Sequence, residues 1–449
     1  ALQRHPLAIL VLMRRMFTWQ QIPKMMELKA LLEAAVAQHP EWPAAERGNL
    51  LGECDLIQSF LFYNDITQMS RLHRSASRQM SRPAVTLRNS GSWTFGSPSV
   101  LMMYYRAPGE LGKELAEMYE CMPHYYKITN GHGRGAELLM DAEAAYLQGA
   151  WEKAAVLLER ARADAAGQEN MTLCCDFLAL RLALCGKGKE GYDFAAKRAA
   201  LLQKHDGVQV HLLESIAAYF YALQGRPEQA PELFREHKLA EVSFFGPCRP
   251  MMSLIEQQVW LAQGEYVKVI AHSEGLLRRC EAMHYGLVGL QARIQLAAAQ
   301  LRFGQRADAR AALAAALLDA LQDDFWVLFV EQYPALAPLL EGEDWAVCEP
   351  RLGPFVARIL PAGRAFAARL GLPAPAPAPE LPLTDRDREL ARLVAGRCTN
   401  KEIAAALYLS EGTVKQYINQ LYAKLDMGGD PRTRRARLAE WYQKNAPRN

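Results

Sequence analysis

A repeated turn glycine in the middle of the chain constrains the fold more than any other feature of the sequence. Five segments of similar composition, among them "YLQGAWEKAAVLLERA" and "LRFGQRADARAALAA", each place one glycine between two helix-forming stretches. Successive glycines are 37, 39, 39 and 40 residues apart, and a near-constant period of this size is typical of stacked helical hairpins. The five positions are Gly149, Gly186, Gly225, Gly264 and Gly304.

The clearest of these units surrounds Gly149. We expect Gly149 to make the turn and Trp151 to pack over it. Ala154 and Ala161 are small enough to let the two helices approach closely. The unit resembles a tetratricopeptide repeat, lengthened from the usual 34 residues or so, and the next unit, at Gly186, resembles it less.

Hairpins of this kind bury their apolar faces only by stacking, which produces a curved solenoid with a concave side available to a partner. The segment "FLFYNDITQMSRLHRSASRQM" suggests an earlier, degenerate copy that turns near Asn64. No stretch alternates polar and apolar residues as a strand does. The sequence therefore predicts an all-α chain built on a TPR-like helical-repeat solenoid, which points to binding and not to catalysis.

Length and composition exclude several classes of protein. With 449 residues, half of them apolar, the chain can hold two or three domains. Its nine cysteines are an odd number without a CxxC pair or a His/Cys cluster at zinc spacing, which favours a reducing cytoplasm. No apolar run reaches the roughly 18 residues of a membrane span, and no cleavage site follows the apolar start. We therefore expect a cytoplasmic protein with no membrane partner.

The chemistry-bearing residues form no recognisable catalytic set. The sequence shows no paired carboxylates, no nucleophile with its base and no metal-binding cluster, so we expect no enzyme, no catalytic residue, no metal site and no cofactor. The sequence begins at Ala1 with a helix-forming pattern from its first residues, which suggests a piece of a longer protein.

Charge is unevenly divided along the chain. Residues 383–449 have a formal net charge of +5, whereas residues 1–382 have −2. Such a basic bias is expected of a surface that faces phosphates, and a solvated helix face is the alternative. The basic residues near the C-terminus are Arg432, Arg434, Arg435, Arg437, Lys444 and Arg448.

Residues 86–135 interrupt the repeat with a stretch rich in glycine and aromatic residues. Loops of this composition are typical of recognition surfaces, and the alternative is that the rings plug an irregular junction between hairpins. Within the stretch, "GHGRGAE" either presents backbone amides to an anion at the start of a helix from Ala136 or is a plain helix-initiating turn. The candidate ligand or partner surface comprises Trp93, Tyr125, Tyr126, His132 and Arg134.

A proline-rich segment, "GLPAPAPAPELP", follows Leu370. Alternating prolines preclude a helix and favour polyproline II, a semi-rigid spacer of about 3.1 Å per residue. We therefore expect three parts: a TPR-like sensor or interaction domain in residues 1–370, a Pro/Ala-rich linker in 371–382 and a separate domain in 383–449.

Residues 383–449 contain recognisable helix-capping signals. Capping residues are expected at Thr384, Thr399, Ser410 and Asp430, the first two with capping-box partners at Asp387 and Glu402. The predicted helices cover residues 384–395, 400–407, 411–425 and 431–444.

The second and third of these helices have the pattern of a helix-turn-helix. Apolar side chains fall where the two helices must touch, and a small residue falls where they cross. Along the third helix an apolar stripe faces the core, which leaves a polar set on the other side that is able to reach phosphates and base edges in a major groove. The contact residues are Ile403, Ala404, Leu407, Leu409, Val414 and Ile418, the stripe continues through Leu421 and Leu425, and the polar set is Thr413, Lys415, Gln416 and Asn419.

The string "LTDRDRELARLVAGRCTNKEIAAALYLSEGTVKQYINQLYAKL", residues 383–425, resembles the LuxR/GerE-type DNA-binding domain almost without a gap. The resemblance implies a four-helix domain that docks its third helix in the major groove of double-stranded DNA and often dimerises through its fourth. It implies base-reading roles for Lys415, Gln416 and Asn419, and backbone-gripping roles for Thr399, Asn400, Lys401, Thr413 and Lys424. Tyr417 departs from the histidine that is frequent in the family, and "MGGDPRTRRA" looks about two residues longer than the usual loop before the last helix.

A LuxR-type domain behind a helical-repeat array further resembles the C-terminal part of the MalT-like regulators, in which an ATPase module precedes the repeats and the repeats receive an inducer. No G-x-x-x-x-G-K-[ST] string occurs, so the nucleotide switch is either absent or lost by truncation. The sequence thus predicts a transcriptional regulator that binds DNA, senses a small-molecule or protein effector on its repeats, works with RNA polymerase and forms a homodimer on DNA. The alternative is a repeat scaffold for protein assembly with a DNA-anchoring tail.

Overall fold

The structure is a computed structural model. It describes residues 5–87, 91–188, 191–204, 206–372, 385–425, 427 and 430–445, with the side chains of 385, 388, 423, 424, 431, 432 and 443–445 outside the description. The described residues form helices and irregular segments without a β-strand, which confirms the all-α prediction. In this part of the chain no helix is both long enough and apolar enough to cross a membrane.

The described chain divides into two compact units, and several helices pass from one unit into the other. The first unit comprises Ala1–Val259, Gly275–Leu290 and Ala320–Val327, and the second comprises Trp260–Glu274, Gln291–Asp319 and Leu328–Asn449. The predicted boundary at residues 371–382 falls almost entirely outside the described residues and stays a prediction.

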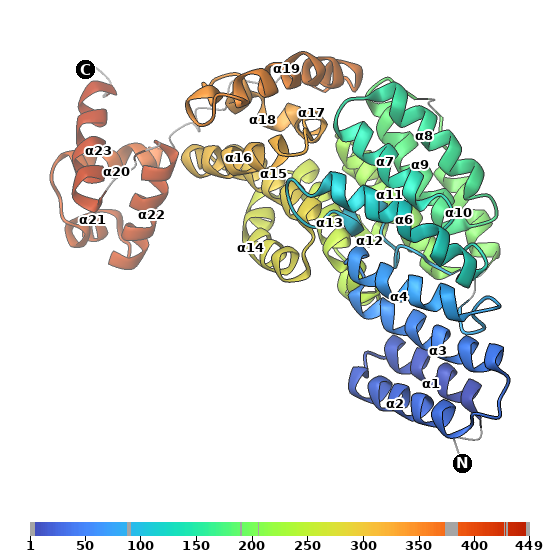
Figure 1. Ribbon diagram of the computed structural model, residues 1–449. Coiled ribbons are helices and arrows are strands. Elements are labelled where there is room, and N and C mark those ends of the chain that lie inside the picture. Colours follow the sequence, from blue (N-terminus) through green and yellow to red (C-terminus); the bar gives the residue numbers. More distant parts are fainter. Residues whose placement is uncertain are drawn as a thin grey trace. The chain divides into compact units, whose positions relative to one another are not determined.

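The first unit begins with helices that pack in sequence order. Helix α1 packs on α2 and α3, α3 packs on α4, α4 packs on α6, and α6 packs on α7 (Figure 1). Helices wholly within this unit are α1 Pro6–Thr18, α2 Ile22–Gln38, α3 Ala44–Ser59, α4 Ile66–Gln79, α5 Val100–Tyr104, α6 Leu111–Thr129, α7 Ala136–Leu147, α8 Trp151–Asp164, α9 Glu169–Leu184, α10 Phe194–Gln203, α11 Gly207–Leu223 and α12 Glu232–Arg235, with short 3-10 turns at Phe60–Phe62, Pro227–Gln229, Leu239–Glu241 and Gly246–Cys248.

The predicted turn glycines all lie between the end of one helix and the start of the next. Their φ angles are between 68° and 88°, in the left-handed region that glycine adopts without a Cβ penalty. The two helices of a hairpin meet at Gly149, Gly264 and Gly304, whereas the hairpin at Gly225 has only the four-residue α12 as its returning helix.

The later helices are α13 Arg249–Gln263, α14 Tyr266–Met283, α15 Gly286–Arg302, α16 Arg306–Leu321 and α17 Val327–Glu331.

The ring nearest to the Cα of Gly149, on the side where a Cβ would lie, is that of Trp326. A Cβ on Gly149 would lie 2.1 Å from Cζ2 of Trp326, whose Nε1 donates a hydrogen bond of 2.7 Å to the carbonyl of Gln148. Trp151 instead contacts Trp326 edge-on, with ring centroids 6.0 Å apart. The sequence analysis did not predict this contact, because Trp326 is far along the chain. The packing of Trp151 over Gly149 stays a prediction.

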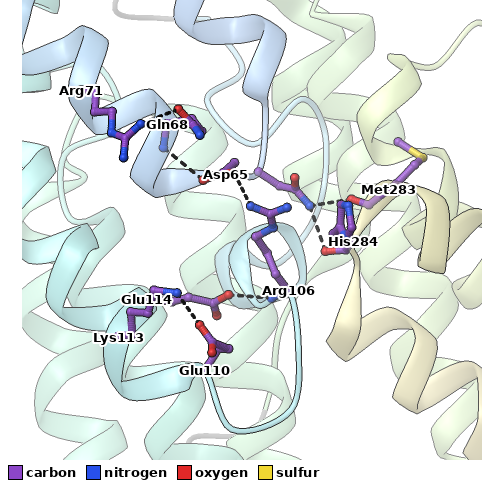
Figure 2. Close-up of polar contacts among 10 residues, drawn as sticks. Asp65, Gln68, Arg71, Arg106, Glu110, Lys113, Glu114, Met283 and His284 are labelled. Carbon is purple, nitrogen blue, oxygen red and sulfur yellow. Dashed lines mark hydrogen bonds and ion pairs between the residues drawn. The ribbon is translucent and has the colours of Figure 1, made fainter.

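The predicted early turn near Asn64 joins α3 to α4. The Asn64 side chain donates hydrogen bonds to the carbonyls of Met283 at 2.9 Å and His284 at 3.0 Å, in the turn between α14 and α15. Asp65 beside it forms an ion pair with Arg106. Figure 2 shows this group of polar side chains, in which the α14–α15 turn is fixed to the N-terminal helices of the same unit.

Much of residues 86–135 is helical, which corrects the expectation of a loop. Helices α5 and α6 lie within it, and α6 continues through Pro123. Buried polar side chains hold the irregular remainder in place. Asn170 on α9 accepts hydrogen bonds from the backbone amides of Trp93 and Thr94 at 3.0 and 3.2 Å, and Glu143 on α7 accepts one from the amide of Leu101 at 2.7 Å.

The second unit has separate small cores. Trp260, Val269 and Ala299 form one of them, which joins α14 to parts of α13 and α15. In the following segment α18 packs on α19. The remaining helices of this unit are α18 Tyr333–Leu340, α19 Leu352–Arg369, α20 Asp385–Ala395, α21 Asn400–Leu407, α22 Glu411–Lys424 and α23 Pro431–Asn445, with a 3-10 turn at Trp345–Val347.

Candidate functional site

Among the described residues, helices α20 to α23 and the segments between them enclose a core of their own. Every predicted helix–helix contact takes part, and α20 and α23 add side chains for which the sequence analysis gave no role. The buried members are Leu390, Ala391, Leu393, Val394, Ile403, Ala404, Val414, Ile418, Leu421, Tyr422 and Leu438, and Leu407, Leu409 and Leu425 are among the partly buried residues packed against them. The apolar stripe of α22 therefore faces a closed core.

The predicted caps fix where α21, α22 and α23 begin. Thr399 and Glu402 form a reciprocal capping box at the start of α21. Ser410 accepts a hydrogen bond from the amide of Thr413 at 3.1 Å, and Asp430 accepts one from the amide of Thr433 at 3.2 Å. These caps satisfy backbone amides that have no partner inside a helix. The cap predicted at Thr384 lies outside the described residues.

The turn between α21 and α22 is made by Tyr408. This residue ends α21 with φ 55° and ψ 45°, a left-handed conformation that a side chain disfavours. Its ring is 95 % exposed. The backbone amide of Tyr408 donates to the carbonyl of Ala404, so the end of α21 sets the turn.

The three predicted base-reading residues share the exposed side of α22. Lys415, Gln416 and Asn419 are all exposed, whereas Val414 and Ile418 of the same helix are buried. One ammonium group and two amide groups on the same helix face can donate hydrogen bonds to base edges in a major groove, and the amides can also accept them. The arrangement is thus able to perform direct readout.

The predicted backbone-gripping residues have mixed environments. Lys401 is exposed, and Thr413 is half-buried with its hydroxyl 2.7 Å from that of Ser410. Thr399 is committed to the capping box, since its hydroxyl donates to Glu402. Asn400 accepts a hydrogen bond on Oδ1, which leaves its amide nitrogen as a donor. The side chain of Lys424 lies outside the described residues.

Two arginines contact residues of this surface, and the sequence analysis gave neither of them a specific contact. Arg435 on α23 donates to Oδ1 of Asn400 at 3.1 Å and to the carbonyl of Cys398. Arg386 on α20 lies over the ring of Tyr417, 4.4 Å from its centroid. The sequence showed only that both residues are basic. It could not show their contacts, because each contact joins two helices that are distant along the chain.

A cavity of about 780 Å³ lies within the first unit, a size typical of small-molecule sites. Trp93, Tyr125 and His132, three of the five predicted surface residues, line it. Tyr126 and Arg134 are not among its lining residues. Four aromatic residues of this stretch, Trp93, Tyr104, Tyr105 and Tyr125, are buried, as the junction alternative predicts. Three of these four also line the cavity.

Both histidines that line the cavity are neutral and fully engaged. His132 Nε2 donates to the carbonyl of Gly91 at 3.1 Å, so its Nδ1 accepts the hydroxyl hydrogen of Tyr125 at 2.7 Å. Burial lowers the pKa of His132 to about 4 and that of His73 to about 3. His73 contacts Ser59 through Nε2 and Cys121 through Nδ1. Neither histidine supplies a positive charge near neutral pH.

The "GHGRGAE" segment is a turn in which most backbone amides have a hydrogen-bond acceptor within the protein, including those of Gly131, Arg134 and Ala136. The amide of Gly133 donates to Gln168 at 2.6 Å, and that of Gly135 donates to the hydroxyl of Tyr126 at 3.1 Å. Arg134 is exposed, whereas His132 is buried. The structure thus supports a plain helix-initiating turn and not an anion site.

Comparison with known proteins assigns the C-terminal part of the chain. Residues 381–433 match the family described as "Bacterial regulatory proteins, luxR family". The uncharacterized transcriptional regulatory protein YvfU of Bacillus subtilis is 46 % identical over 61 residues, which is 14 % of this chain and 30 % of that protein. The DNA-binding transcriptional activator DevR/DosR of Mycobacterium tuberculosis is 38 % identical over 86 residues, 19 % of this chain and 39 % of that protein.

A third relative, the transcriptional regulatory protein DesR of Bacillus subtilis, is 46 % identical over 46 residues, 10 % of this chain and 23 % of that protein. The chain thus spans less than two fifths of the length of each of these relatives. No solved structure matches it. The C-terminal part of the chain carries a luxR-family helix-turn-helix domain, and the resemblance to the MalT-like regulators stays an expectation.

Proposed function

We propose that this protein is a transcriptional regulator that binds double-stranded DNA through α22 and controls that binding through its helical-repeat part. The observation that carries the proposal is the division of α22 into two faces. Val414 and Ile418 close the core, and Lys415, Gln416 and Asn419 remain exposed together. Docking of the exposed face in a major groove leaves the core intact.

The surroundings of α22 suit a phosphate backbone on either side of the groove. Lys401 is exposed near the start of α21, and the side-chain amide nitrogen of Asn400 is able to donate. Arg435 adds positive charge beside Asn400. Contacts of this kind position a protein on the duplex without reading its sequence.

Selection from random DNA tests the proposal. The full chain is incubated with a pool of random duplexes, the bound fraction is recovered, and the fraction is sequenced. We expect one enriched motif, and an inverted repeat within it would indicate that two copies bind together. A variant with Lys415→Ala and Asn419→Ala serves as the control and should enrich no such motif. The absence of enrichment with the unaltered chain would instead favour the scaffold alternative.

The helical-repeat part is proposed to receive the effector. Stacked hairpins provide binding surfaces, and the cavity in the first unit provides an enclosed space of ligand size. Control of transcription through RNA polymerase and homodimer formation on DNA belong to the same proposal.

A further inference from the structure

We propose that the cavity in the first unit binds an organic acid, with its apolar body among the aromatic rings and its carboxylate paired with Arg14. This inference rests on the proposed function, in which the helical-repeat part receives an effector, and it names the chemical class of that effector.

The first argument is the charge of the cavity. Among the described residues that line it, Arg14 on α1 carries the only formal charge, and neither aspartate nor glutamate lines it. Arg14 forms no ion pair with any residue in the described part of the chain, and its buried Nη1 has no hydrogen-bond partner there. Burial lowers the pKa of Arg14, yet a guanidinium stays protonated in proteins. Arg14 is half-buried, and its buried Nη1 lacks a hydrogen-bond partner among the described residues, which is costly for a charged group. An anionic ligand would supply that partner.

The second argument is the apolar character of the remaining wall. The Arg14 guanidinium lies over the ring of Phe60, 4.6 Å from its centroid, and 5.5 Å from that of Phe17. Trp93 and Tyr104 add a pair of rings with centroids 5.3 Å apart. Such a wall favours an aromatic or aliphatic body. The buried hydroxyl of Ser92 has no hydrogen-bond partner among the described residues and is a second polar group for the ligand to meet.

The third argument is that the other polar groups cannot neutralise an anion. His73 and His132 are neutral and use both ring nitrogens, and the Tyr125 hydroxyl donates to His132. Arg14 is near enough to this group that its charge contributes to lowering the pKa of His132. A carboxylate in the cavity therefore has Arg14 as its ionic partner among the described residues.

Matched acids and amides test the inference on the full chain. Binding of 1-naphthaleneacetate, 1-naphthaleneacetamide, octanoate and octanamide is measured by calorimetry for the unaltered protein, Arg14→Met and Arg15→Met. Arg15 is the control because it is exposed, lies next to Arg14 on α1 and does not line the cavity. We expect at least one acid to bind about tenfold or more tightly than its amide to the unaltered protein and to Arg15→Met. Arg14→Met should lose this preference.

Thermal unfolding of each variant shows whether a lost preference for the acid comes from a folding defect. Without ligand, Arg14→Met should unfold cooperatively at a temperature close to that of the unaltered protein, because the change removes an unpartnered buried Nη1 together with the ring contacts of the guanidinium. Arg14→Lys, which keeps the charge, should retain part of the preference for the acid.

Three results would overturn the inference: no acid binds the unaltered protein, acid and amide bind equally, or Arg14→Met still prefers the acid. The DNA selection described above separates this failure from that of the proposed function. An enriched motif without acid binding rejects only the organic-acid site. Acid binding without an enriched motif rejects only the regulator.

Discussion

Arg435 on α23 donates a hydrogen bond to Oδ1 of Asn400 at the start of α21, with 3.1 Å between the two atoms. The same guanidinium donates to the carbonyl of Cys398, so one side chain joins the last helix to the turn between α20 and α21. The Asn400 amide is thereby held beside the surface proposed to face DNA. The last helix thus supports the helix-turn-helix as well as closing the core.

Residues 380–449 should fold without the rest of the chain. In the part of the segment that the structure describes, the buried core comes from α20 to α23. Three of the helices begin at caps supplied within the segment. Circular dichroism of this fragment should show a helical spectrum and a cooperative thermal transition. An unfolded spectrum would show that the core needs support from the repeats.

Replacement of Arg435 by methionine should destabilise this fragment by about 1–3 kcal/mol, because charge-assisted hydrogen bonds to Asn400 and Cys398 are lost and a carbonyl is left without its donor. Urea unfolding measures the change. Lys401→Met is the control, since Lys401 is exposed, and it should change the stability by less than about 0.5 kcal/mol. Equal effects of the two changes would mean that the Arg435 contacts contribute nothing.

Tyr408→Gly should stabilise the same fragment by about 1 kcal/mol. Tyr408 has φ 55° and a 95 % exposed ring, so glycine removes a Cβ penalty and loses little packing. Tyr408→Ala is the matched control, because alanine keeps the Cβ and should give no such gain. Urea unfolding of both variants decides the point, and a stabilising alanine would assign the effect to removal of the ring.

Alanine substitutions at two turn glycines distinguish the cost of backbone strain from the cost of steric overlap. Gly149 and Gly264 have φ of 74° and 80°. A Cβ at Gly149 would meet Trp326 at 2.1 Å, whereas at Gly264 the nearest atom is the hydroxyl of Tyr266 at 4.0 Å. Gly264→Ala should therefore cost about 1–2 kcal/mol from strain alone, and Gly149→Ala should cost about 1–3 kcal/mol more. Thermal unfolding of the full-length variants tests the order, and a smaller loss for Gly149→Ala would contradict it.

Local signals account for what the sequence could predict. The four C-terminal helices were predicted to within about two residues at each end, because caps such as Thr399 and Asp430 and an apolar stripe act over a few neighbouring positions. The turn glycines were found for the same reason, since a left-handed φ requires little more than the residue itself.

Contacts between distant residues account for what could not be predicted. Trp326 covers Gly149, Asn64 binds the turn at His284, and Arg14 shares a cavity with Trp93. Each pair is separated by many tens of residues, and no periodicity links its members. Trp93, Tyr125 and His132 were chosen as aromatic or polar residues in an irregular stretch, a signal that marked the region but gave no sign of the arginine facing it.

The central claim is that the exposed face of α22 reads base sequence, and comparison of two lysine variants on DNA tests it most directly. Affinities of Lys415→Ala and Lys401→Ala are measured on the selected site and on single-base variants of it, over a range of salt concentrations. Lys415→Ala should lose about 1–3 kcal/mol on the selected site and discriminate less at one base pair. Lys401→Ala should weaken binding to every duplex alike and reduce the salt slope by about 0.9. The reverse pattern, with Lys401→Ala changing the sequence preference and Lys415→Ala lowering affinity evenly, would contradict the claim.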